Sequence, residues 1–352
     1  MNDTKALFAS FLKQQPTSTL NKNVQKIDVQ SRVTYDMFKN GLNAINIKLP
    51  EKTVKRIFKQ IDSNASGDID YLEWISFLDP RLLGGLNPHR KINNKSLTTL
   101  TDDELKQMNN MIARLEILAE RASERGVRLM IDAEQTYFQP AIDHLVLGLQ
   151  RKYNRTIPLI YNTYQCYLKD SYSRLVVDIE RAKREGFLFA AKTVRGAYMV
   201  QERKRAAELQ LEDPIQPSID ATHDNYDKCV DYILQHIEIA DIMVATHNEQ
   251  SVRYVESRMR ELLIPAKGGG VFFGQLLGMC DHVTFTLGVM GFSVFKYVPY
   301  GQIQEVIPYL LRRAEENSNL LGSATKERKL IARELIRRTV PSLLKHLKPI
   351  QD

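Results

Sequence analysis

The stretch Phe187–Tyr198 reads FLFAAKTVRGAY, an apolar run that ends in lysine, arginine and glycine. Five further segments have the same form, an apolar run rich in Val, Ile, Leu and Phe that ends in polar or glycine residues: VRLMIDAEQ (127–135), PLIYNTYQ (158–165), DIMVATHN (241–248), GVFFGQLLG (270–278) and FSVFKYVPYG (292–301). A long amphipathic stretch follows each run. Strands that alternate with helices in this way indicate βα units and a parallel sheet. The sequence therefore predicts an α/β fold with six βα units.

Polar and special residues gather where these strands are expected to end: Asp132, Glu134, Gln165, Lys192, Arg195, Gly196, His247, Asn248, Gln275 and Tyr297. In folds of parallel strands, active residues collect just past the carboxyl ends of the strands. We therefore expect a functional site along that edge of the sheet.

Two arginines, Arg312 and Arg313, are adjacent in YLLRRAEEN, downstream of the strand-like KYVPYG. Each guanidinium offers a planar fork of donors that can bind a carboxylate bidentately. The spacing of apolar residues predicts a helix here, with Pro308 in its first turn. The alternative is an exposed helix with an ion pair between Arg312 and Glu316, four residues apart on one face. The strand ends upstream favour a carboxylate receptor.

The segments IDAEQTYFQP, YNTYQCYLKD, KTVRGAYMVQE, ATHN, FFGQLLGMCD, FKYVPYG and YLLRRAEEN follow one another from about Arg128 to Asn317. In this order they resemble the proline dehydrogenase family, FAD-dependent enzymes built on a distorted (β/α)8 barrel. The resemblance implies oxidation of L-proline to 1-pyrroline-5-carboxylate, with electrons passed through FAD to a quinone. It also implies a mitochondrial location on the matrix side of the inner membrane. Hydroxyproline dehydrogenase is the alternative substrate assignment.

The resemblance assigns the substrate pocket and the FAD contacts to separate sets of residues. Around the substrate it implies Asp132, Tyr198, Leu276, Tyr297, Arg312 and Arg313. For FAD it implies Gln165, Lys192, Val194, Gly196, Ala197, Thr222, His247, Asn248 and Glu316. In the related hydroxyproline dehydrogenases the position that matches Tyr297 is typically smaller, so Tyr297 favours proline.

The residue chemistry agrees with these roles. Hydride removal beside a secondary amine needs a fixed substrate, a neutralised carboxylate and exclusion of water. Gly196 permits close backbone approach to a cofactor, and Lys192 and Arg195 bring positive charge. Taken alone, Gly196 is also compatible with an ordinary bulge, and His247 with a structural histidine.

A second motif runs from Asp62 to Glu73, DSNASGDIDYLE. It has oxygen donors at loop positions 1, 3 and 5, glycine at 6, an apolar residue at 8 and glutamate at 12, which is the pattern of an EF-hand Ca²⁺ loop. The predicted metal ligands are Asp62, Asn64, Ser66, Asp68, Asp70 and Glu73. A solvated acidic turn is the alternative.

EF-hands normally pair, and the best partner loop is Lys26–Met37. Lys26 and Met37 replace the first carboxylate and the final glutamate, so we expect this loop to pack without binding metal. The predicted organisation is a helix and loop over residues 1–20, an EF-hand-like module over 20–80, a polar linker over 81–105, the barrel over 106–325 and a basic helix over 326–352. Thr101 and Glu104 indicate a capping box at the start of the first barrel helix.

The sequence departs from the family at its beginning. The family barrel has two strands before the one that ends at Asp132, and the second carries a lysine that joins the arginines at the substrate carboxylate. We find no such segment and expect six of eight strands, with two open edges that favour association with another chain. The chain is then a fragment of a longer protein or a variant completed by another chain. A catalytically impaired barrel with a calcium-binding or interaction role is therefore the second functional hypothesis.

Composition adds less. The net charge is +7 and 43% of residues are hydrophobic. The basic charge is not accompanied by a nucleic-acid recognition motif, so we expect no nucleic-acid partner. The three cysteines have no metal-ligand spacing, which is typical of a reducing compartment. We find no apolar run of about 18 residues and no clear presequence.

Overall fold

The computed structural model describes residues 8–12, 31–44, 47–77, 91–92, 95–96, 101–316 and 321–339. The chain forms two compact units. The first contains residues 1–164, 169–191 and 238–240, and the second contains residues 165–168, 192–237 and 241–352.

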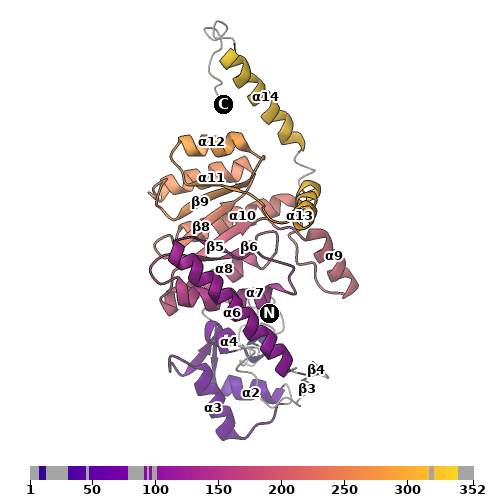
Figure 1. Ribbon diagram of the computed structural model, residues 1–352. Helices are drawn as coiled ribbons and strands as arrows, with labels where there is room; N and C mark the ends of the chain where they lie inside the picture. Colours follow the sequence, from indigo (N-terminus) through magenta and orange to yellow (C-terminus); the bar gives the residue numbers. More distant parts are fainter. Residues whose placement is uncertain are drawn as a thin grey trace. The chain divides into compact units, whose positions relative to one another are not determined.

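Six strands form one curled parallel sheet in the order β10-β9-β8-β7-β6-β5 (Figure 1). Their bounds are β5 (Leu129–Met130), β6 (Ile160–Gln165), β7 (Phe189–Val194), β8 (Ala240–Ala245), β9 (Val271–Leu276) and β10 (Val294–Tyr297). Each strand coincides with one of the six predicted apolar runs, and only β8 extends beyond its run, by the single residue Ala240. All six residues of β6 are buried, as expected for a parallel sheet covered on both faces. The predicted α/β fold with six βα units is confirmed and has the form of a half-barrel.

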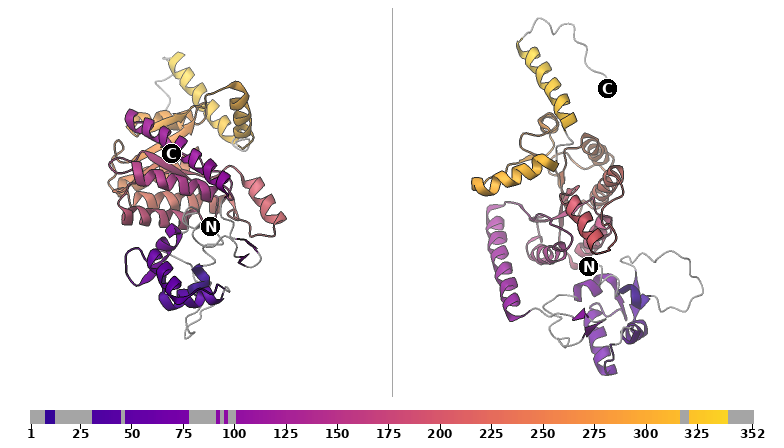
Figure 2. Two further views of the ribbon diagram at one scale, coloured as in Figure 1. Left: turned by 60° about the horizontal axis from the view of Figure 1, so that its bottom comes forward. Right: turned by 90° about the vertical axis from the view of Figure 1, so that its right-hand side faces the viewer.

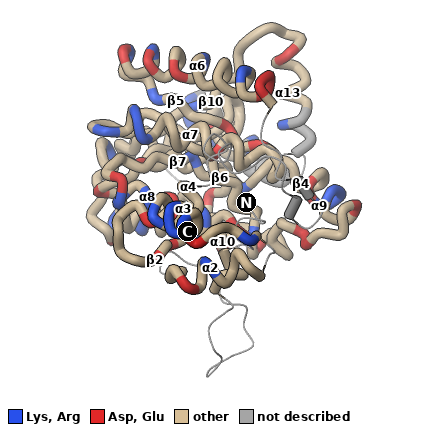
Figure 3. The backbone as a smooth tube through the Cα atoms, turned by 90° about the horizontal axis from the view of Figure 1, so that it is seen from below, with Lys and Arg blue, Asp and Glu red and all other residues tan. Residues whose placement is uncertain are grey.

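In the first unit, α6 (Asp102–Arg125), α7 (Gln139–Tyr153) and α8 (Ser171–Glu185) accompany the early strands. The predicted capping box opens α6, because Thr101 accepts a bond from the Glu104 amide and the Glu104 carboxylate accepts one from the Thr101 amide. Gly126 ends the helix in the left-handed conformation. Figure 3 shows residues of both charge signs along α6.

The second unit contains six helices in its described residues: α9 (Met199–Glu208), α10 (Ile219–Leu234), α11 (Glu249–Glu261), α12 (Asp281–Val289), α13 (Ile303–Glu316) and α14 (Leu321–Thr339). Both α9 and α10 lie between β7 and β8, so this connection has one helix more than a simple βα unit. The prediction for Pro308 was wrong, because α13 begins at Ile303 and Pro308 lies inside it. Residues upstream of Pro308 already have helical spacing, so the proline interrupts the hydrogen-bond ladder without starting the helix. No helix among the described residues is long and apolar enough to cross a membrane.

The N-terminal part of the first unit is a small helical module with one strand pair (Figure 2). Its elements are β1 (Arg32–Thr34), α2 (Tyr35–Ala44), α3 (Glu51–Ile61), β2 (Asp68–Asp70) and α4 (Tyr71–Phe77). β1 pairs antiparallel with β2, and Val33 lies opposite Ile69. Much of the predicted partner loop, from Lys26 to Gln30, lies outside the described residues.

Aromatic rings form the core of this module. The Phe11 ring contacts the Phe38 and Trp74 rings edge-on, with centroids 5.5 and 5.4 Å apart. Gly41 makes this packing possible, since a Cβ there would stand 1.9 Å from the Phe11 ring. Residues 8–12 are helical, in agreement with the helix expected within residues 1–20.

The predicted linker also contains ordered backbone. β3 (Lys91–Ile92) and β4 (Lys95–Ser96) form a short antiparallel pair. Their polar sequence gave no alternation from which a strand could be predicted.

Candidate functional site

Several predicted site residues of the second unit lie at or just beyond the carboxyl ends of strands, as the sequence indicated. Gln165 is the last residue of β6 and Tyr297 the last of β10. Lys192 and Val194 lie among the last three residues of β7, and His247 lies two residues beyond the end of β8. The strand register thus collects amide, ammonium, imidazole and phenol groups at one edge of the sheet.

The turn after β7 has a steric reason for its glycine. Gly196 has φ +143°, and a Cβ there would stand 2.3 Å from the Tyr167 ring. Its neighbour Ala197 donates its amide to Gln165 Oε1 at 3.4 Å. The close approach at Gly196 is therefore to a side chain of the protein, and Tyr167 accounts for the glycine without a cofactor.

Arg195 is held inside a network of protein side chains. Its Nε donates to His223 Nδ1 at 2.8 Å, and its terminal nitrogens donate to Thr246 Oγ1 at 2.7 Å and Ser251 Oγ at 2.9 Å. The guanidinium also lies over the Tyr226 ring, 4.4 Å from its centroid. Arg195 therefore ties the end of β7 to α10 and α11.

Two neighbours of Arg195 have shifted acidity. Burial, followed by the charge of Arg195, lowers the pKa of His223. Burial raises the pKa of Asp227, which accepts a bond from Ser251 Oγ at 2.6 Å. This network needs an unprotonated Nδ1 on His223, because that nitrogen accepts the hydrogen bond donated by Arg195 Nε.

Thr222 and Asn248, both assigned to FAD by resemblance, have local structural roles. Thr222 Oγ1 donates to the carbonyl of Ser218 at 3.1 Å, and Asn248 Oδ1 accepts from the amide of Ser251 at 3.1 Å as the N-cap of α11. Gln275 is buried and bonds to Thr246 and Thr284. These side chains build the edge of the site.

His247 is fixed by the end of β9. The amide of Leu276 donates to His247 Nε2 at 3.0 Å. Burial and then the nearby Lys296 charge lower the pKa of His247. The imidazole is therefore neutral at pH 7.

An aromatic and cationic cluster follows β10. The rings of Tyr297 and Tyr309 lie 6.1 Å apart, and the Arg313 guanidinium lies 5.5 Å from the centroid of the Tyr309 ring. The structure therefore brings Tyr297 and Arg313 together through Tyr309. Tyr309 was not predicted from the sequence, although its spacing of four residues from Arg313 places both on one helical face. Arg312 and Glu316 lie on the same helix, with side chains outside the described part.

Tyr198 and Asp132 complete the predicted substrate set. Tyr198 is the residue directly before α9. Asp132 belongs to the first unit, two residues beyond β5, and its side chain is exposed.

In the predicted calcium loop, the carboxylates of Asp62 and Glu73 accept hydrogen bonds from other groups of the protein. Asp62 accepts from the amides of Ser66 and Gly67 at 2.9 and 3.0 Å. Glu73 Oε1 accepts from the Ser63 and Asn64 amides at 3.1 and 3.2 Å. Across the described ranges, no three His, Cys, Asp or Glu side chains are grouped as metal ligands. The donor set is all oxygen, as Ca²⁺ requires, and the Glu73 carboxylate also accepts from the Ser63 hydroxyl and the Asp70 amide.

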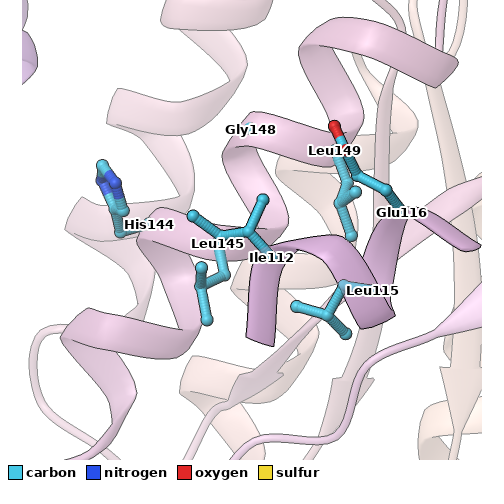
Figure 4. Close-up of a pocket in the computed structure, with 7 residues that line it drawn as sticks. All are labelled: Ile112, Leu115, Glu116, His144, Leu145, Gly148 and Leu149. Carbon is cyan, nitrogen blue, oxygen red and sulfur yellow. The ribbon is translucent and has the colours of Figure 1, made fainter. Parts of the chain in front are cut away.

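A cavity of about 230 Å³ lies elsewhere in the first unit, between α6 and α7 (Figure 4). Its lining is Ile112, Leu115, Glu116, His144, Leu145, Gly148 and Leu149. None of these residues was predicted for the substrate or for FAD.

The fold and the strand-end residues define the class of the protein. A parallel half-barrel with polar groups at its strand ends and an arginine helix beside its last strand has the organisation of the barrel-fold enzymes. A sequence profile described as "Proline dehydrogenase" matches residues 13–325. The chain belongs to the proline dehydrogenase family.

Named relatives agree with this assignment. The human protein "Proline dehydrogenase 1, mitochondrial" is 50% identical over 283 residues, 78% of this chain and 47% of the relative. Human "Hydroxyproline dehydrogenase" is 44% identical over 255 residues, 70% of this chain and 55% of the relative. The chain thus spans about half the length of the curated relatives that it matches.

A solved structure supports the fold. Proline utilization A from Bdellovibrio bacteriovorus, inactivated by N-propargylglycine, aligns with a TM-score of 0.56 at 18% identity. The alignment covers 90% of this chain and 37% of that protein.

Proposed function

We propose that this chain carries the FAD- and substrate-binding strand ends of an enzyme that oxidises L-proline to 1-pyrroline-5-carboxylate, with a quinone as electron acceptor. The observation that carries the proposal is the cluster of Tyr297, Tyr309 and Arg313 beside the end of β10. A cation next to aromatic rings fits a small amino acid that has an apolar ring and a carboxylate. The names of the relatives support proline as the substrate and mitochondria as the location. The position on the matrix side of the inner membrane, where a quinone is available, is part of the proposal.

The residues at the strand ends fit FAD chemically. Gln165, Lys192 and His247 offer amide, ammonium and imidazole groups to the polar edge of a flavin, and Val194 and Ala197 offer backbone and apolar contacts. Bound FAD would accept the hydride from the carbon beside the proline nitrogen. The chain's own part is to neutralise the substrate carboxylate with Arg312 and Arg313, and to pack Tyr198, Leu276 and Tyr297 against the ring. Asp132 is proposed to organise the polar end of the substrate.

Hydroxyproline is the second candidate substrate, because hydroxyproline dehydrogenases are also relatives. Tyr297 argues for proline, since its ring takes up the space that a substrate hydroxyl needs. The test is retention of FAD absorbance by the purified chain, together with the binding of a proline analogue that cannot be oxidised. Absence of both would contradict the proposal, and tighter binding of the hydroxylated analogue would reverse the choice of substrate.

We further propose that the N-terminal module binds one Ca²⁺ ion through Asp62, Asn64, Ser66, Asp68, Asp70 and Glu73. Two observations support it. β1 and β2 pair with Val33 opposite Ile69, which are the apolar positions expected to pair between two EF-hand loops. Gly67 has φ +89° at loop position 6, where the sharp turn needs glycine. A calorimetric titration of the chain with Ca²⁺ tests this site.

A further inference from the structure

Lys296 on β10 directs its ammonium at the turn that follows β9. Its Nζ donates to the carbonyl of Met279 at 2.6 Å and to that of Leu276 at 3.3 Å, and pairs with Asp281 Oδ1 at 2.7 Å. An ammonium has three N–H donors, and three acceptors surround this one. The side chain is 19% exposed. Lys296 is therefore committed to the turn and is not a solvated surface lysine.

The turn itself needs restraint. Gly278 and Cys280 both have positive φ, 78° and 51°. The left-handed conformation is unfavourable for a residue with a Cβ, so Cys280 keeps it only where its surroundings hold it. Cys280 Sγ contacts the carbonyl of His247 at 3.5 Å, and the amide of Leu277 donates to the carbonyl of Tyr297 at 3.0 Å. The strongest donors on the turn are those of Lys296, because they are charged.

Leu276 connects this ammonium to His247. Its carbonyl accepts from Lys296, and its amide donates to His247 Nε2. A ring nitrogen that accepts a backbone N–H cannot carry a proton, so the proton of the neutral ring lies on Nδ1. Protonation of Nε2 would bring two N–H groups face to face.

We propose that Lys296 is a positioning residue that fixes the turn after β9 and, through Leu276, holds His247 as the neutral Nδ1–H tautomer. Both ends of this chain of contacts lie in the proposed site, since Leu276 is assigned to the substrate ring and His247 to FAD. The arrangement gives a bound ligand one fixed donor, Nδ1–H. The inference rests on the proposed function for its importance, but its test needs neither FAD nor activity.

Charged groups near His247 act in the expected direction. Lys296 disfavours the imidazolium, and Asp281 partly offsets its charge. The neighbouring pair of His282 and Glu249, 2.7 Å apart, bridges α12 and α11. Burial, followed by the Lys296 charge, lowers the pKa of His247.

Long-range ¹⁵N–¹H NMR of the full chain tests the proposal, because the two histidine tautomers give different patterns. His247 is assigned by loss of its signals in His247→Gln. The wild-type chain is expected to show the Nδ1–H pattern at neutral pH, and His247 is expected to titrate below the ordinary histidine value. In Lys296→Met the Nε2–H form should appear and the pKa of His247 should rise, since a nearby like charge is removed. Lys267→Met, at an exposed lysine, should change neither.

Two outcomes would overturn the inference. One is an Nε2–H pattern for His247 in the wild-type chain, and the other is an unchanged tautomer and titration in a folded Lys296→Met. If circular dichroism shows that Lys296→Met does not fold, Lys296→Gln retains a donor for one carbonyl and should shift His247 partway in the same direction. Failure to bind FAD would contradict the proposed function and would leave these NMR results unaffected.

Discussion

At the scale of single residues, the structure adds most to the sequence prediction at Arg195 and Gly196, because it shows which side chains these residues contact. Both were expected at the cofactor because charge and backbone freedom are useful there. The structure gives Arg195 three side-chain acceptors and gives Gly196 the ring of Tyr167. Partners 28 to 56 residues away in the sequence are required for this network, so local sequence could not reveal it. The residue types in the sequence predicted that polar groups lie at the strand ends, but they did not predict which side chains those groups contact.

Of the two arginines proposed to bind the substrate carboxylate, Arg313 has a described side chain and is tested first. Substitution Arg313→Met keeps much of the side chain's length and removes its charge, so a carboxylate ligand should lose one bidentate partner. We expect binding of a proline analogue to weaken by about 2–4 kcal/mol, with FAD binding much less affected. Calorimetry measures the first and flavin absorbance the second.

The matched control for this prediction is Arg333→Met, at an exposed arginine of α14. It should leave both affinities unchanged. Equal analogue affinity in Arg313→Met and the parent chain would remove Arg313 from the carboxylate site.

Tyr297 determines the predicted substrate preference. Its ring packs against Tyr309, and Tyr297→Ser should open space beside the ring of the substrate. A pocket change of this size is typically worth about 1–3 kcal/mol, so relative affinity should shift toward hydroxyproline analogues. The ratio of the two dissociation constants is the measurement. Tyr300→Ser, at a tyrosine that is 93% exposed, is the control, and an unchanged ratio in Tyr297→Ser would argue against the steric explanation.

At the scale of elements, local signals predicted the strands and the start of α6 well. Apolar runs of six or so residues between polar ends gave all six strands, and Thr101 with Glu104 gave the helix start because a capping box uses contacts within one turn. The second helix between β7 and β8 was missed because apolar periodicity does not show where one amphipathic stretch becomes two. The start of α13 was predicted wrongly because proline is common in the first turn of a helix. In the structure α13 begins at Ile303, and Pro308 lies inside the helix.

The module and α8 also form a contact that no local pattern predicts. Arg184 of α8 pairs with Asp70 of the predicted calcium loop, and Val177 packs against the module's aromatic core. Burial raises the pKa of Tyr71 to about 12. The Asp70 carboxylate is 2% exposed, so it depends on Arg184 for compensation of its charge. The loop is therefore linked to the helix that follows β6.

For the module we expect one calcium site per chain, not two. The loop from Asp62 has a complete set of oxygen ligands, whereas Lys26 and Met37 remove two carboxylates from the partner loop. Calorimetry should show one site that is lost in Glu73→Gln, because that change removes the bidentate ligand. Asp36→Asn is a control in the partner region. Two sites, or no heat of binding in the parent chain, would contradict the prediction.

At the scale of the whole molecule, the described residues supply six strands of the parallel sheet, and β5 and β10 lie at the two ends of its strand order. Near β10 the second unit exposes large apolar side chains: Phe285 at 70%, Val289 at 89%, Tyr300 at 93% and Ile303 at 77%. Exposed apolar surface of this kind beside an unpaired strand edge favours association. The family barrel pairs such an edge with further strands, one of which carries the lysine that the resemblance places at the substrate carboxylate.

We therefore expect the 352-residue chain, expressed alone, to be a poor proline oxidase even when FAD is supplied. The resemblance implies a lysine at the substrate carboxylate that we do not find in this sequence, and removal of one comparable preorganised donor costs about 10²–10³ in rate. Water entering at the open edge weakens the remaining electrostatic interactions as well. The chain should bind the dye ANS and elute as oligomers, which fluorescence and size-exclusion chromatography measure. A compact monomer that keeps yellow FAD and reduces a quinone analogue with proline at roughly 1–10³ s⁻¹ would show instead that these six strands form a sufficient site.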